Sequence, residues 1–98
     1  MNLKVEFSGG LDLIFGGKKG VLDVSVPFSS DKPRIGELLP WMRDNMITER
    51  PELFMKGETV RPGILVLINE VDWELSGMLD SELSEGDAIV FISTLHGG

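Results

Sequence analysis

The groups that could carry chemistry in this sequence are few, and the most suggestive stand at its last positions. A predicted, strongly apolar strand ends at Leu95, and His96, Gly97 and Gly98 follow it. Glycine has no side chain and a wide range of backbone conformations, so this end could thread through a narrow channel and present the carboxylate of Gly98 to an enzyme. We therefore expect a flexible tail at 96–98 that works through that carboxylate. The alternative is an ordinary frayed end.

A carboxylate is a poor electrophile and must be activated, for instance as an acyl-adenylate, before sulfur or an amine can attack it. Activation needs ATP, yet the sequence has neither a Gly-x-x-x-x-Gly-Lys-Ser/Thr nor a Gly-x-Gly-x-x-Gly pattern. The glycines at 9–10 and 16–20 are instead typical of turns. We expect no bound cofactor in this chain, with ATP used by a second, activating protein.

The other candidates for catalysis or metal binding are isolated. The chain has no cysteine, which excludes thiolate chemistry, and His96 is its single histidine. A lone histidine lacks the further ligands that a metal site needs, and no serine nucleophile motif surrounds it. The acids Glu82, Glu85 and Asp87 are more typical of a solvated face than of a catalytic pair. The sequence therefore predicts no metal site and no enzyme activity of its own.

The charge balance constrains the partners. Sixteen acidic residues face nine basic ones, which gives a formal net charge of −7. Such a surface repels a phosphate backbone, so direct binding of nucleic acid is disfavoured and a partner with a basic face is favoured. The alternative is that the acidity only keeps the chain soluble. The apolar runs at 64–68 and 88–92 are too short to cross a membrane. We expect a soluble monomer without membrane contact, in the cytoplasm and also in the nucleus.

The elements that must position the tail begin with an expected hairpin. Residues 3–7 alternate apolar and polar side chains, residues 11–15 keep an every-other-residue spacing, and residues 21–26 alternate again. The glycines at 9–10 loosen the first arm, and the glycines and lysines of 16–20 supply the turn. The first third of the chain is therefore predicted to be two antiparallel strands.

One main helix is predicted over 34–46, because apolar residues recur there three and four positions apart. Polar residues and a proline at 29–33 are typical of a helix start. Pro40 conflicts with this pattern, since proline in a helix interior removes a hydrogen bond and costs roughly 3 kcal/mol. We expect a bend or an irregular turn before Pro40.

The second half of the sequence alternates loops with short strands. We expect a long connection with one turn of helix over 48–63, a strand buried on both faces at 64–68, a tight turn at 69–70, a short edge strand at 71–74, a helical turn at 80–83 and a last strand at 88–95. This order fits an α+β domain in which a mixed sheet packs on one main helix. It is the element order of the β-grasp (ubiquitin-like) architecture, and it predicts one domain over 1–98.

Four stretches carry a resemblance to a known family. They are Glu-Arg-Pro-Glu-Leu-Phe at 49–54, Arg-Pro-Gly-Ile-Leu-Val-Leu-Ile-Asn at 61–69, Asp-Trp-Glu-Leu at 72–75 and Phe-Ile-Ser-Thr-Leu-His-Gly-Gly at 91–98. These stretches resemble the ubiquitin-related modifier proteins that act in eukaryotic tRNA thiolation. The resemblance spans the chain and is densest after Thr48, whereas the first half matches mainly in pattern, and Pro40 departs from it.

The resemblance implies a β-grasp fold related to ubiquitin and to bacterial sulfur carriers of molybdopterin and thiamine synthesis. It implies that Leu95, His96 and Gly97 thread into an activating enzyme that adenylates Gly98. A rhodanese-type domain would then supply persulfide sulfur to form a thiocarboxylate. A tRNA-thiolating enzyme complex would use that sulfur to make 2-thiouridine at the wobble position of cytosolic tRNAs. Members of the family also become attached to lysine side chains of target proteins, notably under oxidative stress.

Three functions remain open from the sequence. Sulfur carriage and covalent attachment to proteins use the same tail, so the sequence does not separate them, and both can hold. The third is a noncovalent ubiquitin-like interaction module, for which the last two glycines would be dispensable. In each case we expect recognition through an apolar patch near the tail, drawn from 64–68 and 89–92, although most of these residues must lie in the core.

Overall fold

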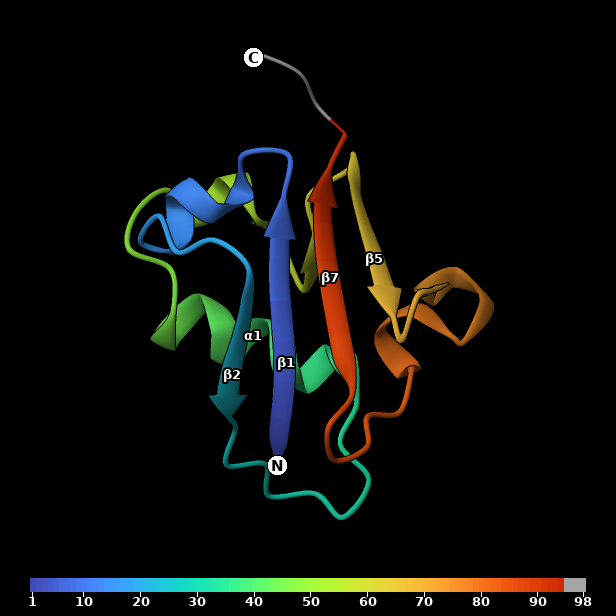
Figure 1. Cartoon of the computed structure of the whole chain (residues 1–98). Helices are drawn as coiled ribbons and strands as arrows, with labels where there is room; N and C mark the ends of the chain where they lie inside the picture. Colours follow the sequence, from blue (N-terminus) through green and yellow to red (C-terminus); the bar gives the residue numbers. More distant parts are fainter. Residues whose placement is uncertain (95–98) are drawn as a thin grey trace.

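The computed structural model describes residues 1–94 of the 98-residue chain. Its elements in chain order, with 3-10 helices written η, are β1 (Asn2–Ser8), η1 (Leu11–Phe15), β2 (Val21–Ser25), α1 (Ile35–Asn45), η2 (Pro51–Leu53), β3 (Met55–Lys56), β4 (Thr59–Val60), β5 (Ile64–Ile68), β6 (Val71–Asp72), η3 (Trp73–Leu75), η4 (Met78–Asp80) and β7 (Ala88–Ser93). Five strands form a sheet with α1 lying behind it, as Figure 1 shows.

The five-stranded sheet has the order β2-β1-β7-β5-β6, so the last strand in the sequence lies at its centre. β7 runs parallel to β1 and antiparallel to β5, and β1 and β2 form an antiparallel pair. β3 and β4 form a separate two-stranded hairpin. The predicted α+β arrangement, a mixed sheet packed on one main helix, is therefore confirmed.

The hydrophobic core lies between the sheet and α1. The strands contribute Leu3, Val5, Phe7, Ile64, Val66, Ile68, Ile89 and Phe91, and the helix contributes Ile35, Leu38, Leu39 and Met42. The prediction that 64–68 is buried on both faces was wrong. Leu65 and Leu67 are half-buried on the opposite face, because α1 covers the sheet on one side. The alternation of side chains in an extended strand sends neighbouring residues to opposite faces.

The segment 11–15 is a 3-10 helix, so the predicted extension of the first strand was wrong there. Leu11, Ile14 and Phe15 are buried while Leu13 is 66% exposed, which is a three- and four-residue spacing. Gly9 and Gly10 both have positive φ angles, 71° and 91°, and turn the chain out of β1. The rest of the predicted hairpin is confirmed, since β2 pairs with β1 beyond the glycine-rich turn.

The helix start differs from the expected one at 29–33. The N-cap residue is Arg34, whose backbone N–H donates to the carboxylate of Glu37 at 2.8 Å. The proline of this region, Pro33, is buried before the helix rather than inside its first turn. The helix bounds lie within one residue of the predicted range at each end.

Pro40 lies inside α1, which continues through it as one element. Because proline has no backbone N–H, the carbonyl of Gly36 has no donor at the usual position four residues on. Gly36 lies where the helix passes closely over η4. A Cβ atom added there would stand 3.1 Å from the carbonyl oxygen of Leu79. The helix therefore combines a weakened hydrogen-bond ladder with a close tertiary contact.

The second half contains more regular structure than the sequence predicts. The connection 48–63 includes the expected helical turn, η2, and also the unexpected hairpin β3–β4. The predicted edge strand 71–74 is strand for two residues and then becomes η3, and the helical turn expected at 80–83 lies slightly earlier, as η4. The turn at Asn69 and Glu70 is confirmed, with φ angles of 50° and 71°. These short elements depend on tertiary contacts more than on local pattern.

Candidate functional site at the end of β7

The predicted tail at 96–98 lies beyond Thr94, the last residue that the structure describes. Leu95, His96, Gly97 and Gly98 lie outside the described residues, so their roles stay predictions. The structure does show how the chain is held up to Thr94. β7 is clamped in the middle of the sheet by a parallel neighbour and an antiparallel neighbour, which fixes the direction of the strand that leads into the tail.

Two contacts fix the end of β7 on either side. The backbone N–H and the hydroxyl of Thr94 both donate to the carbonyl oxygen of Gly63, at 2.8 and 2.5 Å. On the other side, Gly9 passes so close to β7 that an added Cβ atom would collide with the carbonyl oxygen of Ser93. Sequence reasoning missed these positions. The one available signal was the glycine pair that interrupts the alternation after β1.

An aromatic cluster supports this end of the sheet from inside. Phe7 stacks on Phe15 with ring centroids 3.8 Å apart and on Phe91 at 5.8 Å. Phe54 meets Phe15 and Phe91 edge to face at 5.0 and 5.3 Å. Such pairs contribute roughly 0.5–1.5 kcal/mol each beyond the area that they bury. The cluster joins β1, β7, η1 and the residue after η2, so the strand that leads into the tail rests on a rigid base.

The face of the sheet opposite α1 carries a half-buried apolar patch beside this strand end. Register pairs Leu65 with Ile92 and Leu67 with Val90 on adjacent strands, and all four side chains point away from the core. We call these four residues the outer sheet patch. Of the ranges 64–68 and 89–92 from which a recognition patch was expected, the structure turns the alternate members outward, and their role in recognition stays a prediction. The remaining members of those two ranges, such as Val66 and Phe91, lie in the core.

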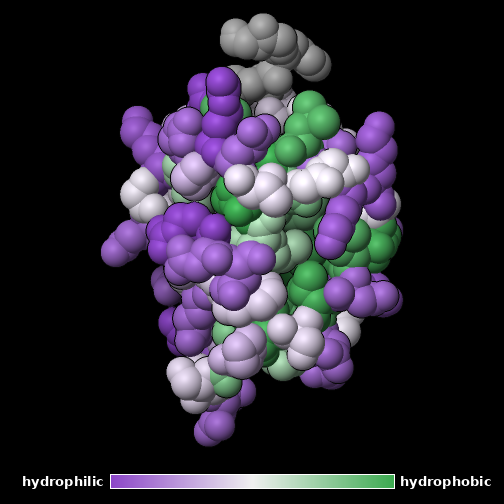
Figure 2. All heavy atoms as spheres, turned by 90° about the vertical axis from the view of Figure 1, so that its left-hand side faces the viewer, coloured by the Kyte–Doolittle hydropathy of each residue, from purple (hydrophilic) through white to green (hydrophobic). Residues whose placement is uncertain are grey.

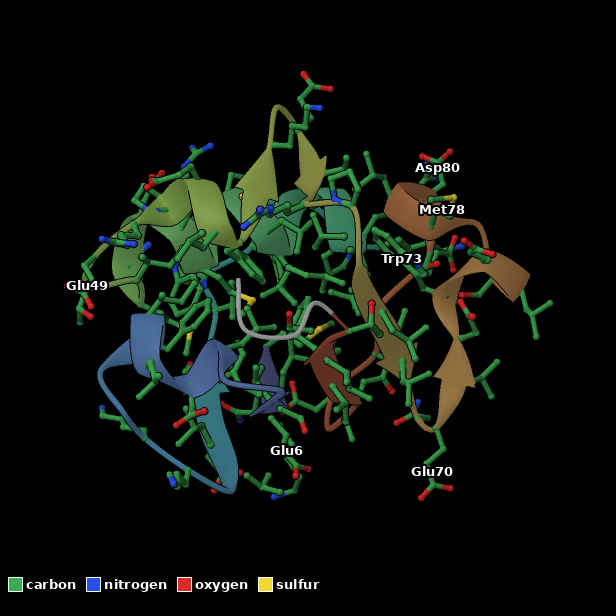
Figure 3. All side chains as sticks on the ribbon, turned by 90° about the horizontal axis from the view of Figure 1, so that it is seen from above. Glu6, Glu49, Glu70, Trp73, Met78 and Asp80 are labelled. Carbon is green, nitrogen blue, oxygen red and sulfur yellow. The ribbon has the colours of Figure 1, made fainter. Side chains whose placement is uncertain are left out.

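The rim of the outer sheet patch is acidic. Glu6 lies beside Val90 on β1, and Asp72 lies opposite Leu67 on β6. Figure 3 shows Glu6 pointing away from α1, whereas Trp73 lies inside the fold. The sequence around the patch is also acidic, since residues 62–98 hold seven acidic residues and no lysine or arginine. An apolar centre with an acidic rim fits a partner surface with an apolar centre and basic rim.

Within residues 1–94 the structure contains no arrangement that suggests catalysis. The one buried polar residue there is Ser81, whose hydroxyl lies 2.8 Å from that of Ser76. No group of three or more acidic or histidine side chains in the described part of the chain is placed to hold a metal ion. None of the helices there is long and apolar enough to cross a lipid bilayer.

An open cavity of about 570 Å³ lies between α1, the β3–β4 hairpin and η4, away from the outer sheet patch. Pro40, Met55 and Leu79 contribute to its walls. Its charged side chains are exposed, and two of them, Arg34 and Asp80, approach each other at 3.5 Å. An exposed ion pair of this kind is screened by solvent and is no sign of a catalytic site, so we keep the end of β7 as the candidate functional site.

Comparison with known proteins identifies the family. The profile of Urm1 (ubiquitin related modifier) matches residues 2–98. The chain belongs to the ubiquitin-related modifier family. It is 63% identical to the ubiquitin-related modifier 1 homolog of Chlamydomonas reinhardtii, over 100% of this chain and 99% of that protein. It is 51% identical to human ubiquitin-related modifier 1, over 100% of this chain and 96% of that protein.

The fold agrees with this family assignment. The solution structure of Urm1 from Trypanosoma brucei superposes with a TM-score of 0.80 and 38% sequence identity, covering 99% of this chain and 95% of that one. The chain therefore has the ubiquitin-like β-grasp fold that the order of its elements predicts. Family and fold together place it among ubiquitin-like modifier and carrier proteins.

Proposed function

We propose that this protein is a sulfur carrier whose Gly98 carboxylate is adenylated, converted to a thiocarboxylate and used as the sulfur donor for 2-thiolation of the wobble uridine in cytosolic tRNAs. The observation that carries the proposal is the family match, which extends over residues 2–98 and so includes the glycine pair. The clamped end of β7 supports it, because a carrier must present its terminal group from a rigid base.

The chemistry requires two partners. The first is an activating enzyme with a rhodanese-type domain, which binds ATP. Attack of the Gly98 carboxylate on the α-phosphate of ATP yields the acyl-adenylate and pyrophosphate. The outer sulfur of the enzyme persulfide then attacks the acyl carbon and AMP leaves, which forms an acyl disulfide. A second enzyme thiol attacks the S–S bond, which becomes an enzyme disulfide and releases the thiocarboxylate. The carrier contributes no catalytic side chain and no bound cofactor. A tRNA-thiolating enzyme complex takes the sulfur, so the carrier itself needs no contact with nucleic acid.

The outer sheet patch is the surface that we assign to the activating enzyme. It lies on β5 and on β7, the strand that leads into the tail. One docking event can therefore position both the patch and Gly98. Its acidic rim at Glu6 and Asp72 would steer a basic enzyme surface toward it. The carrier is proposed to act as a cytoplasmic monomer, since a second copy on this face would compete with the enzyme.

The decisive experiment measures the intact mass of the protein. The purified chain is incubated with an activating enzyme, Mg-ATP and a sulfur source, with the human relative as a positive control. Exchange of one oxygen for sulfur, absent without ATP and absent in a variant that lacks Gly98, is the expected result. An unchanged mass under conditions that thiolate the human relative would contradict the proposal.

A second function uses the same carboxylate. The family is one of ubiquitin-related modifiers. Acyl transfer from activated Gly98 to a lysine amine would form an isopeptide bond with a target protein. The test is recovery of lysine-linked conjugates from oxidant-treated cells that express the tagged chain, compared with a variant lacking Gly98. Conjugates that persist without Gly98 would exclude this route. Wobble-uridine thiolation that persists in the same variant would instead favour a noncovalent interaction module.

A further inference from the structure

The strand β2 leaves one edge of its backbone without a partner. It is the end strand of the sheet and pairs, in the described part of the chain, with β1. Met1 and Val26 exchange two hydrogen bonds of 2.8 Å, one in each direction, which makes them a hydrogen-bonded pair. In an antiparallel ladder such pairs alternate, so Leu22 and Val24 also bond to β1.

The residues between them face the other way. The backbone N–H and C=O groups of Val21, Asp23 and Ser25 point sideways from the edge of the sheet, away from β1. An independent bond confirms this assignment. The N–H of Lys4, which lies opposite Asp23, donates to the carbonyl of Asp87 at 2.9 Å on the β7 side. No hydrogen bond found within residues 1–94 occupies the outward N–H groups of the three β2 residues.

The usual features that protect a sheet edge are missing from β2. Prolines, bulges and inward-pointing charges normally block pairing with another chain. β2 contains no proline, and its register with β1 is continuous over five pairs. The charge of Asp23 is held on the outer face by the amine of Lys4 at 2.9 Å. The opposite edge differs, because β6 has two residues and then turns into η3.

Apolar side chains flank this edge. Val21 is 56% exposed, and Leu22 and Val24 are half-buried on the face that α1 covers. The C-terminal half of α1 lies behind β2 in Figure 1 and carries the half-buried Trp41, and the half-buried Met46 follows the helix directly. Figure 2 looks onto this side of the molecule and shows apolar side chains gathered along its middle, with hydrophilic ones on both sides. An added strand would therefore gain apolar contacts as well as backbone hydrogen bonds.

The charge at one end of β2 restricts the occupant. Lys18 and Lys19 are exposed just before the strand, and neither takes part in an ion pair within the described residues. This local positive charge contrasts with the net charge of −7 of the chain. A segment with acidic residues over these lysines would be favoured over a basic one.

We propose that the free edge of β2 binds an extended segment of another protein as a sixth strand, with alternating apolar side chains and acidic residues at the end over Lys18 and Lys19. The outward groups recur about every 7 Å along a strand, so three of them match a segment of roughly five to seven residues. This site lies at the opposite edge of the sheet from β5 and β6. It therefore leaves the outer sheet patch and the end of β7 free, and it does not depend on the sulfur-carrier proposal.

The test uses two synthetic peptides with blocked ends, Val-Thr-Val-Thr-Val-Asp-Asp and Asp-Asp-Val-Thr-Val-Thr-Val. The first places its acids over the lysines in an antiparallel addition and the second in a parallel one. Amide hydrogen exchange of the full chain is followed by NMR. A bound strand should slow exchange at Val21, Asp23 and Ser25 by about tenfold or more, with little change at Leu22 and Val24.

Matched variants separate the backbone edge from the side chains. Asp23→Pro removes one outward N–H without breaking the ladder to β1, and Asp23→Asn removes the same charge but keeps the N–H. The first should abolish peptide binding and the second should retain it. If Asp23→Pro does not fold, a peptide N-methylated at its β2-facing positions replaces it and should fail to bind wild-type protein. Reversal of charge in Lys18→Glu with Lys19→Glu should weaken binding of the acidic peptides.

Three results would overturn the proposal. The first is no slowing of exchange with either peptide at millimolar concentration. The second is exchange or chemical-shift changes confined to the outer sheet patch. The third is slow exchange at Val21, Asp23 and Ser25 that appears in the free protein and rises with its concentration, because that would assign the edge to a second copy of the chain.

Discussion

Thr94 donates two hydrogen bonds, from its backbone N–H and its hydroxyl, to the single carbonyl oxygen of Gly63 at 2.8 and 2.5 Å. This contact ties the last described residue to the start of β5. The two residues are 31 positions apart in the sequence, yet the antiparallel register of β5 and β7 brings them together. The end of the strand is thus held by a side chain as well as by the sheet ladder.

The hydroxyl of Thr94 should make a small, measurable contribution to stability. Thr94→Val removes one hydrogen bond while keeping the branched shape, so the free energy of unfolding should fall by about 0.5–1.5 kcal/mol. Urea denaturation measures this change, with Thr94→Ser as the control that keeps the hydroxyl. No loss in Thr94→Val, with a loss only in Thr94→Ser, would show that the methyl group, and not the hydrogen bond, matters.

Gly9 should tolerate no side chain, whereas Gly10 should tolerate alanine at moderate cost. Both have positive φ angles, but a Cβ atom at Gly9 would collide with the carbonyl of Ser93, and one at Gly10 would meet no atom of residues 1–94 within 4 Å. Gly10→Ala should cost about 1 kcal/mol from backbone strain, and Gly9→Ala at least about 2 kcal/mol. Thermal unfolding compares the two variants. Similar melting temperatures would contradict the close approach of β1 and β7.

The outer sheet patch should control recognition by the activating enzyme. Leu65→Lys places a charge on the half-buried outer face opposite Ile92, and it should lower the rate of Gly98 adenylation at limiting carrier by about tenfold or more. Leu13→Lys is the matched control, because Leu13 is 66% exposed on η1. ATP–pyrophosphate exchange measures the rate. Unchanged activity of Leu65→Lys, or equal loss in the control, would assign the docking surface elsewhere.

Glycine substitutions at the two positions of the turn between β5 and β6 should change the stability of the protein in opposite directions. Glu70 has a φ of 71° and points away from the fold, so Glu70→Gly should stabilise the protein by about 0.5–1 kcal/mol. Asn69 also has a positive φ angle, but its side-chain amide makes two hydrogen bonds of 3.0 Å. Its NH₂ group donates to the carboxylate of Asp87, and its oxygen accepts from the backbone N–H of Ala88. Asn69→Gly should therefore destabilise it. Glu70→Gln controls for the lost charge, and urea denaturation gives both signs.

Much of the fold could be read from local patterns. The alternation at 3–7 and 21–26, the helical spacing at 34–46 and the turn at Asn69 and Glu70 each reflect a period or a conformation that neighbouring residues impose. The prediction for 11–15 was wrong because two apolar spacings overlap in this segment, and tertiary packing buries the helical set Leu11, Ile14 and Phe15.

The sequence by itself determined the main strands, the main helix and the family stretches, because these depend on residue types and their spacing. The chemistry that it suggests for its last residues stays a prediction. Tertiary structure decided which of the apolar residues at 64–68 and 88–92 face outward, and it placed Gly9 and Gly63 beside the end of β7. Among the described residues it also left one edge of β2 without a neighbouring strand. Each of these features arises from pairing between strands far apart in the chain, and no local pattern records which strands will become neighbours.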